Sequence, residues 1–143
     1  MAVIVVGGVI KKDGKYLLVQ EGKGMVRGKW NIPAGRLDPL ESIFDGAKRE
    51  IFEECGLQVE LTGILQISNK TYEEHPFIGM VFSTNIIGGD VNIDNSEIID
   101  AKWFTPNEII AMKDQLRSYN WIVAAVDRNE KNKITSLDLI NNI

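Results

Sequence analysis

The clearest chemical signal in the chain comes from glutamates Glu50, Glu53 and Glu54, spaced at offsets of zero, three and four. At about 100° per residue of a helix, the three carboxylates would converge on one face. Mg²⁺ and similar hard cations prefer oxygen ligands, and one or two carboxylates usually hold them together with the phosphates of a substrate. The spacing therefore indicates a divalent-metal site and phosphate chemistry. The alternative is a solvated acidic helix face.

An amphipathic helix is expected to position these carboxylates. An apolar stripe recurs at spacings of three, four and four, about a quarter-turn from the glutamates. It consists of Phe44, Ala47, Ile51 and Cys55. Gly56, directly after the stripe, is typical of a residue that ends a helix. We expect the apolar face of this helix to pack against the core and the glutamate face to take part in the chemistry.

Two further glycines belong to the same prediction. Gly35 follows the run Trp30 to Ala34, which we expect to be a short strand, and its missing Cβ would let the backbone approach a metal. Gly46 lies one helical turn before Glu50, where we expect the missing side chain to leave room for metal and phosphate.

The run from Gly35 to Leu57 reads GRLDPLESIFDGAKREIFEECGL and agrees with the signature called the Nudix box at every constrained position. The chain therefore resembles the Nudix hydrolase family, of the MutT-like kind. This resemblance implies an α/β (α+β) fold in which a mixed β-sheet is sandwiched between helices. It also implies an enzyme that hydrolyses phosphoric anhydride bonds.

The resemblance also implies roles for individual residues. Glu50, Glu53 and Glu54 would bind Mg²⁺ or Mn²⁺ with the backbone carbonyl of Gly35, and one of the three would act as general base. Arg49 would orient a neighbouring glutamate through a charge-assisted hydrogen bond. The remaining implied residues are Glu41, which would tie the preceding loop to the helix, Gly56 as a structural residue, and Glu97 as a further acid before the strand that ends near Trp103.

Candidate substrate contacts lie outside the helix. The loop 21–29 lacks the spacing of a P-loop and of a dinucleotide fingerprint, so we interpret it as a mobile hairpin loop whose cations could reach a phosphate. Aromatic residues downstream of the box could stack on a nucleobase. The candidates are Lys23, Arg27 and Lys29 in the loop, Arg36 beside Gly35, and the aromatic residues Tyr72 and Phe77. His75 is the only histidine, which argues against a zinc cluster.

The other elements are expected to form one domain, 1–143. Strands are predicted at 3–10 and 16–20, joined by a turn at Asp13-Gly14, and at 58–67, 77–87 and 98–104. The run Thr105-Pro106-Asn107-Glu108 predicts the start of a helix. A last helix is predicted from Leu116 to Val126.

Composition agrees with a small enzyme. The chain has 143 residues, 44% hydrophobic residues and a formal net charge of −4. The negative net charge argues against general affinity for nucleic acid. No apolar run approaches the roughly 18 residues that span a membrane. One cysteine and the absence of an export signal predict a cytoplasmic protein. The oligomeric state is left open.

We expect Mg²⁺-dependent hydrolysis of nucleoside tri- or diphosphates, or of related small organic pyrophosphates, by attack of a metal-activated water on phosphorus. The motifs around residues 30–38, 97–109 and 116–118 resemble the NudJ-type phosphatase branch. One alternative is a nucleotide-pool-sanitising pyrophosphatase that releases a nucleoside monophosphate and pyrophosphate. Another is a Nudix-fold sensor that binds a nucleotide without hydrolysing it.

Overall fold

The computed structural model describes residues 1–71, 74–93 and 97–143. Its first sheet has the strand order β5-β1-β7-β6. These strands are β1 (Val3–Val9), β5 (Ala34–Arg36), β6 (Leu57–Lys70) and β7 (Phe77–Gly89). Strands β1 and β7 are parallel, whereas β1 with β5 and β6 with β7 are antiparallel. The sheet is therefore mixed, as expected.

A second sheet is antiparallel and is centred on β3, which pairs with all three of the other strands. Its members are β2 (Lys11–Lys12), β3 (Lys15–Glu21), β4 (Trp30–Asn31) and β8 (Ile98–Phe104). Asp13 and Gly14 both have positive φ, 51° and 76°, which is the conformation of a tight hairpin turn. The turn predicted between the first two strands is thus confirmed.

The single short strand expected at Trp30 to Ala34 is wrong. The chain leaves the second sheet after β4 and enters the first sheet at β5. Ile32 and Pro33 make this crossing, and Pro33 has no backbone N–H to contribute to a continuous strand. Gly35 therefore lies inside β5, which is an edge strand of the first sheet, instead of ending a strand.

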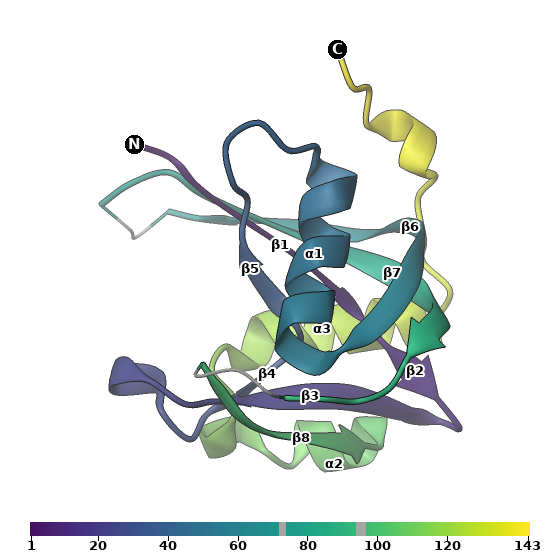
Figure 1. Ribbon diagram of the computed structural model, residues 1–143. Helices are drawn as coiled ribbons and strands as arrows, with labels where there is room; N and C mark the ends of the chain where they lie inside the picture. The colour runs from purple at the N-terminus through teal and green to yellow at the C-terminus, as the bar shows by residue number, and fades with distance from the viewer. Residues whose placement is uncertain (72–73, 94–96) are drawn as a thin grey trace.

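Helices cover both faces of the sheets (Figure 1), with α1 (Ile43–Cys55) in front in this view and α3 (Tyr119–Glu130) behind. Side chains along β7 point alternately toward α1 and toward α3. Met80 and Phe82 pack with Ala47 of α1, whereas Val81 between them packs with Ile122 of α3. Successive side chains of a strand point to opposite faces, so β7 is buried from both sides.

The last two helices begin in different ways. Thr105 and Glu108 form a reciprocal capping box at the start of α2 (Pro106–Ile110), as expected. Helix α3 begins at Tyr119 and not near Leu116, because Leu116 is buried and forms a bridge with Trp30 of β4. No helix among the described residues is both long and apolar enough to cross a membrane.

Candidate active site

A cleft of about 1100 Å³ opens between α1 and α3. The elements contributing side chains to it include β1, β5, β6, β7 and both of these helices. Polar and apolar side chains both line it. The residues that matter below are Glu21, Gly35, Arg36, Glu50, Glu54, Phe77, Glu97, Arg117 and Trp121.

Helix α1 aims two of its three glutamates into this cleft. Glu50 and Glu54 belong to the lining, and the Glu50 side chain is only 14% exposed. Glu53 is 56% exposed and bonds to Arg49 on the helix surface. Glu50 and Glu53 both accept from Arg49 Nη1, whereas Glu54 accepts from the Ala34 backbone N–H, so the three carboxylates are not gathered around one point, and their joint role as metal ligands stays a prediction. Within the described part of the chain, no three acidic, histidine or cysteine side chains are grouped as a metal site.

Glu54 is the most deeply placed of these acids. Its Oε1 accepts a hydrogen bond from the Ala34 backbone N–H at 3.0 Å, which joins α1 to β5. Burial raises the pKa of Glu54 to about 8, opposed by that hydrogen bond and helped by the negative charges of Glu21, Glu50 and Glu97. Burial likewise raises the pKa of Glu50, although Arg49 opposes the shift. Burial is the main cause of both shifts, so these two carboxylates are poorly solvated in the cleft.

Gly35 lies directly against the Glu50 carboxylate. A Cβ on Gly35 would stand 2.1 Å from Glu50 Oε2, so only glycine allows this approach. Carboxylate and carbonyl oxygens are suitable donors for a hard divalent cation. The closely placed Glu50 and Glu54, with the Gly35 backbone beside them, thus fit Mg²⁺ or Mn²⁺.

The expectation for Gly46 is wrong. A Cβ there would meet Leu37 Cδ1 at 2.5 Å and Glu41 Oε1 at 2.9 Å. The missing side chain therefore leaves room for the loop before α1, not for metal or phosphate. Gly56 does end the helix as expected, with φ of 81° and its N–H bonded to the Phe52 carbonyl.

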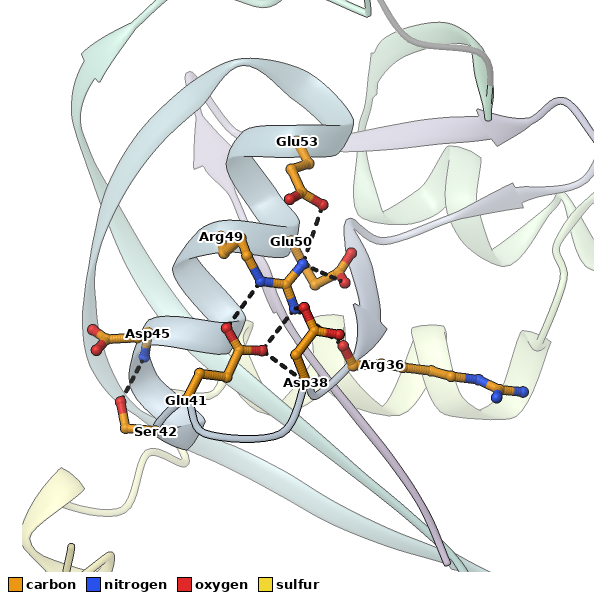
Figure 2. Close-up of polar contacts among 8 residues, drawn as sticks. All are labelled: Arg36, Asp38, Glu41, Ser42, Asp45, Arg49, Glu50 and Glu53. Carbon is orange, nitrogen blue, oxygen red and sulfur yellow. Dashed lines mark hydrogen bonds and ion pairs between the residues drawn. The ribbon is translucent and has the colours of Figure 1, made fainter.

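Arg49 connects the loop to the helix (Figure 2). Its Nε and Nη2 donate to the two carboxylate oxygens of Glu41 at 2.9 and 2.7 Å, and Nη1 donates to Glu50 at 2.9 Å and to Glu53 at 3.1 Å. Glu41 also accepts from the Asp38 backbone N–H at 2.8 Å. Hydrogen bonding to Arg49 lowers the pKa of Glu41 to about 2. The arrangement is that of a guanidinium fixing the orientation of Glu50.

Two more acids reach the cleft from outside α1. Glu97 lies just before β8, where sequence analysis places a further acid. Glu21, at the end of β3, is a residue that sequence analysis missed; its Oε1 accepts a hydrogen bond from Arg117 Nη1 at 3.2 Å. No local pattern identifies Glu21, because only the pairing of β3 with β4 and β8 brings it to the cleft.

For the three cations of the loop 21–29, the expected contacts with a substrate phosphate stay a prediction. The described lining residues do not include Lys23, Arg27 or Lys29. The Arg27 side chain donates to the Gly22 carbonyl within the loop, and the Lys29 side chain donates to the carbonyl of Asp114, which precedes α3. Arg36 does line the cleft, and Figure 2 shows its side chain extending away from the Arg49 network.

The other end of the cleft is aromatic. Phe77 lines it as expected, whereas Tyr72 lies outside the described residues. Trp121 of α3, another residue that sequence analysis missed, joins Phe77 there, and a Cβ on Gly79 would lie 3.3 Å from each of Phe77 Cε1 and Trp121 Nε1. Among the described side chains, Trp121 Nε1 is a buried nitrogen without a hydrogen-bond partner.

The two ends are separated by a short stretch of sheet. Phe77 pairs with Val3 of β1, and Gly35 pairs with Val6. Three positions along β1 correspond to roughly 10 Å, and β5 and β7 lie on opposite sides of β1, roughly another 10 Å across the sheet, so Gly35 and Phe77 are roughly 14 Å apart. The cleft thus places an acidic end and an aromatic end within the reach of one small molecule.

Comparisons with known proteins agree with this geometry. The family described as NUDIX domain matches residues 1–125. The nucleoside triphosphatase NudI of Escherichia coli is 34% identical over 115 residues, covering 71% of the chain and 81% of NudI. The 8-oxo-dGDP phosphatase NUDT18 of Mus musculus is 31% identical over 104 residues, covering 71% of the chain. The chain spans only 31% of the length of that mouse protein.

Solved structures show the same fold. A NUDIX hydrolase from Nitrosomonas europaea superposes with a TM-score of 0.89 at 28% identity, covering 100% of the chain and 98% of that structure. A MutT protein from Methanosarcina mazei gives a TM-score of 0.76 at 27% identity, with 92% and 96% covered. With a family match over residues 1–125 and a cleft built on the matching helix, the chain belongs to the Nudix family.

Proposed function

We propose that the protein is a divalent-metal-dependent hydrolase of nucleoside tri- or diphosphates, or of related small organic pyrophosphates. One observation carries the proposal: Glu50 and Glu54 of the family helix line one cleft beside Gly35. The two relatives described above are named a nucleoside triphosphatase and an 8-oxo-dGDP phosphatase. Their substrates differ, so the class of phosphoric anhydride is proposed here and the individual substrate is not.

In this proposal Glu50, Glu54 and the Gly35 carbonyl hold Mg²⁺ or Mn²⁺, and Glu53 would join them by leaving Arg49. When bound, the cation supplies Lewis-acid activation of water and neutralises charge on the phosphates. A glutamate of α1 accepts the proton of the attacking water. Glu97, which lines the same cleft and whose charge acts on Glu54, is a further acid for that role. Arg49 keeps Glu50 oriented while this happens.

The aromatic end of the cleft favours a nucleotide over a purely aliphatic pyrophosphate. Phe77 and Trp121 offer ring surfaces of the kind on which nucleobases stack. With phosphates at the carboxylate end, the intervening distance of roughly 14 Å leaves room for a sugar. We further propose that one domain, 1–143, does this work in the cytoplasm, a reducing compartment that suits the unpaired, buried Cys55.

Two versions of the reaction are distinguished by their products. A phosphatase of the NudJ-type branch releases orthophosphate from triphosphates and diphosphates. A sanitising pyrophosphatase of the MutT kind releases a monophosphate and pyrophosphate from triphosphates. A nucleotide sensor would release neither.

The test is product analysis after incubation of the protein with Mg²⁺ and a panel of nucleoside tri- and diphosphates. Glu54→Gln should lower turnover by roughly a thousandfold, because a lost metal ligand forfeits several kcal/mol of charge stabilisation. Glu60→Gln is the matched control, since Glu60 lies on β6 outside the cleft lining and bonds to Asn85. Near-normal turnover by Glu54→Gln would refute the assignment.

A further inference from the structure

Arg117 brings positive charge to the acidic end of the cleft. Its guanidinium bonds through Nη1 to Glu21 Oε1 at 3.2 Å, and Glu21 is one of the carboxylates whose charge acts on Glu54. Both Arg117 and Glu21 line the cleft together with Glu50 and Glu54. The guanidinium therefore lies beside the position at which the proposed metal and phosphates would meet.

The backbone of Arg117 is held firmly at this position. Its N–H donates to the Trp30 carbonyl at 2.9 Å, and the preceding Leu116 is buried in a bridge to the same residue. Trp30 in turn packs edge-on against Phe104, with ring centroids 5.2 Å apart. Arg117 thus projects from an anchored segment and not from a freely moving loop.

The ion pair leaves much of the guanidinium available. Glu21 is 13% exposed, whereas Arg117 is 46% exposed, and the pair uses one nitrogen of a group that carries five N–H donors in a fork. A planar fork of this kind matches phosphate oxygens in a bidentate manner. A half-exposed ion pair by itself contributes little to stability. Apart from the bond to Glu21, no described residue accepts a hydrogen bond from the Arg117 side chain, so its other N–H donors are available to a phosphate.

We propose that Arg117 binds the phosphate oxygens of the substrate, and that Glu21 holds its guanidinium at the cleft before the substrate arrives. This inference rests on the proposed function and adds to it a phosphate-binding residue outside the family helix. It replaces the loop cations Lys23, Arg27 and Lys29, which do not line the cleft. Arg117 is on this view a substrate-binding residue, and Glu21 is a positioning residue.

The test measures binding without turnover, by calorimetric titration of a β,γ-methylene nucleoside triphosphate in the presence of Mg²⁺. Arg117→Gln should weaken binding by roughly 10- to 100-fold, the loss expected for one or two hydrogen bonds to a charged group. Arg117→Lys should fall between the wild type and Arg117→Gln, because it keeps the charge and loses the fork. Binding of the unphosphorylated nucleoside should not change.

Lys131→Gln is the matched control, since Lys131 is also half-exposed and paired with an acid, Asp127, at 3.0 Å, but lies outside the cleft lining. Glu21→Gln separates binding from structure. If Arg117 binds phosphate and Glu21 only positions it, Glu21→Gln should weaken binding of the analogue, but by less than Arg117→Gln, with little change in the melting temperature. If the ion pair served structure alone, both variants would lower the melting temperature and the affinity alike, and the inference would be overturned.

Failure of this inference can be told apart from failure of the proposed function. If the wild type binds the analogue and Arg117→Gln binds it equally well, Arg117 is not a phosphate contact while the proposed function stands. If the wild type neither binds the analogue nor hydrolyses any member of the nucleotide panel, both are wrong.

Discussion

Gly35 and Glu50 are so close that any side chain at position 35 would collide with the Glu50 carboxylate: an added Cβ would lie 2.1 Å from one carboxylate oxygen and 2.6 Å from the other. Glu50 has little freedom to retreat, because Arg49 holds it at 2.9 Å and the side chain is only 14% exposed. The glycine on β5 therefore sets the position of a carboxylate on α1.

Gly35→Ala should reduce Mg²⁺-dependent turnover by roughly 10- to 100-fold. The added Cβ would displace the Glu50 carboxylate, and moving a metal ligand should cost about as much as losing a residue that orients one. The backbone of Gly35 is not in the positive-φ region, so alanine should not strain the main chain. Far-ultraviolet circular dichroism should stay near the wild-type spectrum, while the melting temperature should fall somewhat because Glu50 has to move away from the added Cβ. If Gly35→Ala were as active as wild type at the same Mg²⁺ concentration, the position of Glu50 would not matter for turnover.

Arg49→Lys tests the network around Glu50. A lysine ammonium cannot bond bidentately to Glu41 and reach Glu50 and Glu53 as well, so Glu50 should lose its fixed orientation. We expect the apparent affinity for Mg²⁺ to fall by roughly tenfold or more while the melting temperature changes little. The control is Lys48→Gln at the neighbouring helix position, whose ion pair with Asp45 at 3.6 Å is exposed. Equal metal titration curves for wild type and Arg49→Lys would contradict this role.

Sequence reasoning identified the helix of the site because its signals are local. The spacing of Ala47, Ile51 and Cys55 fixes the buried face of α1, and Gly56 fixes its end. The same reasoning could not give the partner of Glu53, because a helical projection gives the direction of a carboxylate but not what it bonds to. Arg49, one turn earlier, draws Glu53 to the surface.

Residues that reach the site through strand pairing could not be predicted in this way. Glu21 and Arg117 are far apart in sequence and meet because β4 lies between β3 and the Leu116 bridge. Trp121 is on a helix whose apolar pattern indicates core packing, yet its indole lies at the cleft. Long-range pairing of this kind has no local sequence signature.

Metal binding should stabilise the protein. Bringing a divalent cation to the cleft relieves repulsion among its carboxylates, and saturation to about 100 times the dissociation constant corresponds to about 2.7 kcal/mol. We expect Mg²⁺ to raise the melting temperature by several degrees in differential scanning fluorimetry. Glu54→Gln should abolish most of that shift and should not destabilise the metal-free protein, because the Gln carbonyl can still accept from the Ala34 N–H. A shift of the same size in both proteins would place the ion elsewhere.

Alkaline pH should destabilise the protein through Tyr16. Burial, and then the hydrogen bond that Tyr16 donates to Glu130 at 2.6 Å, raise the pKa of Tyr16 well above its ordinary value. The folded state therefore retains the phenolic proton that the unfolded chain releases near pH 10. The corresponding stability is fully present below about pH 10 and is lost as the pH rises further, by up to about 1.4 kcal/mol per pH unit.

Urea unfolding at pH 8, 9.5, 10.5 and 11 checks this expectation. Tyr16→Phe should be less stable than wild type at pH 8, because it loses the bonds to Glu130 and Asn129. Its free energy of unfolding should then decline less steeply above pH 10. Parallel declines for the two proteins would mean that Tyr16 does not govern the alkaline transition.

Phe77→Ala separates nucleotides from other pyrophosphates as substrates. If a nucleobase stacks at the aromatic end of the cleft, the loss of one ring should cost about 1 to 3 kcal/mol of binding. KM for nucleoside triphosphates should rise by roughly 5- to 100-fold, while hydrolysis of inorganic tripolyphosphate, which has no base, should not change. Ile87→Ala is the control, because Ile87 is an exposed apolar residue of the same strand, β7, outside the cleft lining. Equal effects of Phe77→Ala on both substrates would indicate that Phe77 supports the cleft without contacting a base, and would favour a small pyrophosphate that binds at the carboxylate end alone.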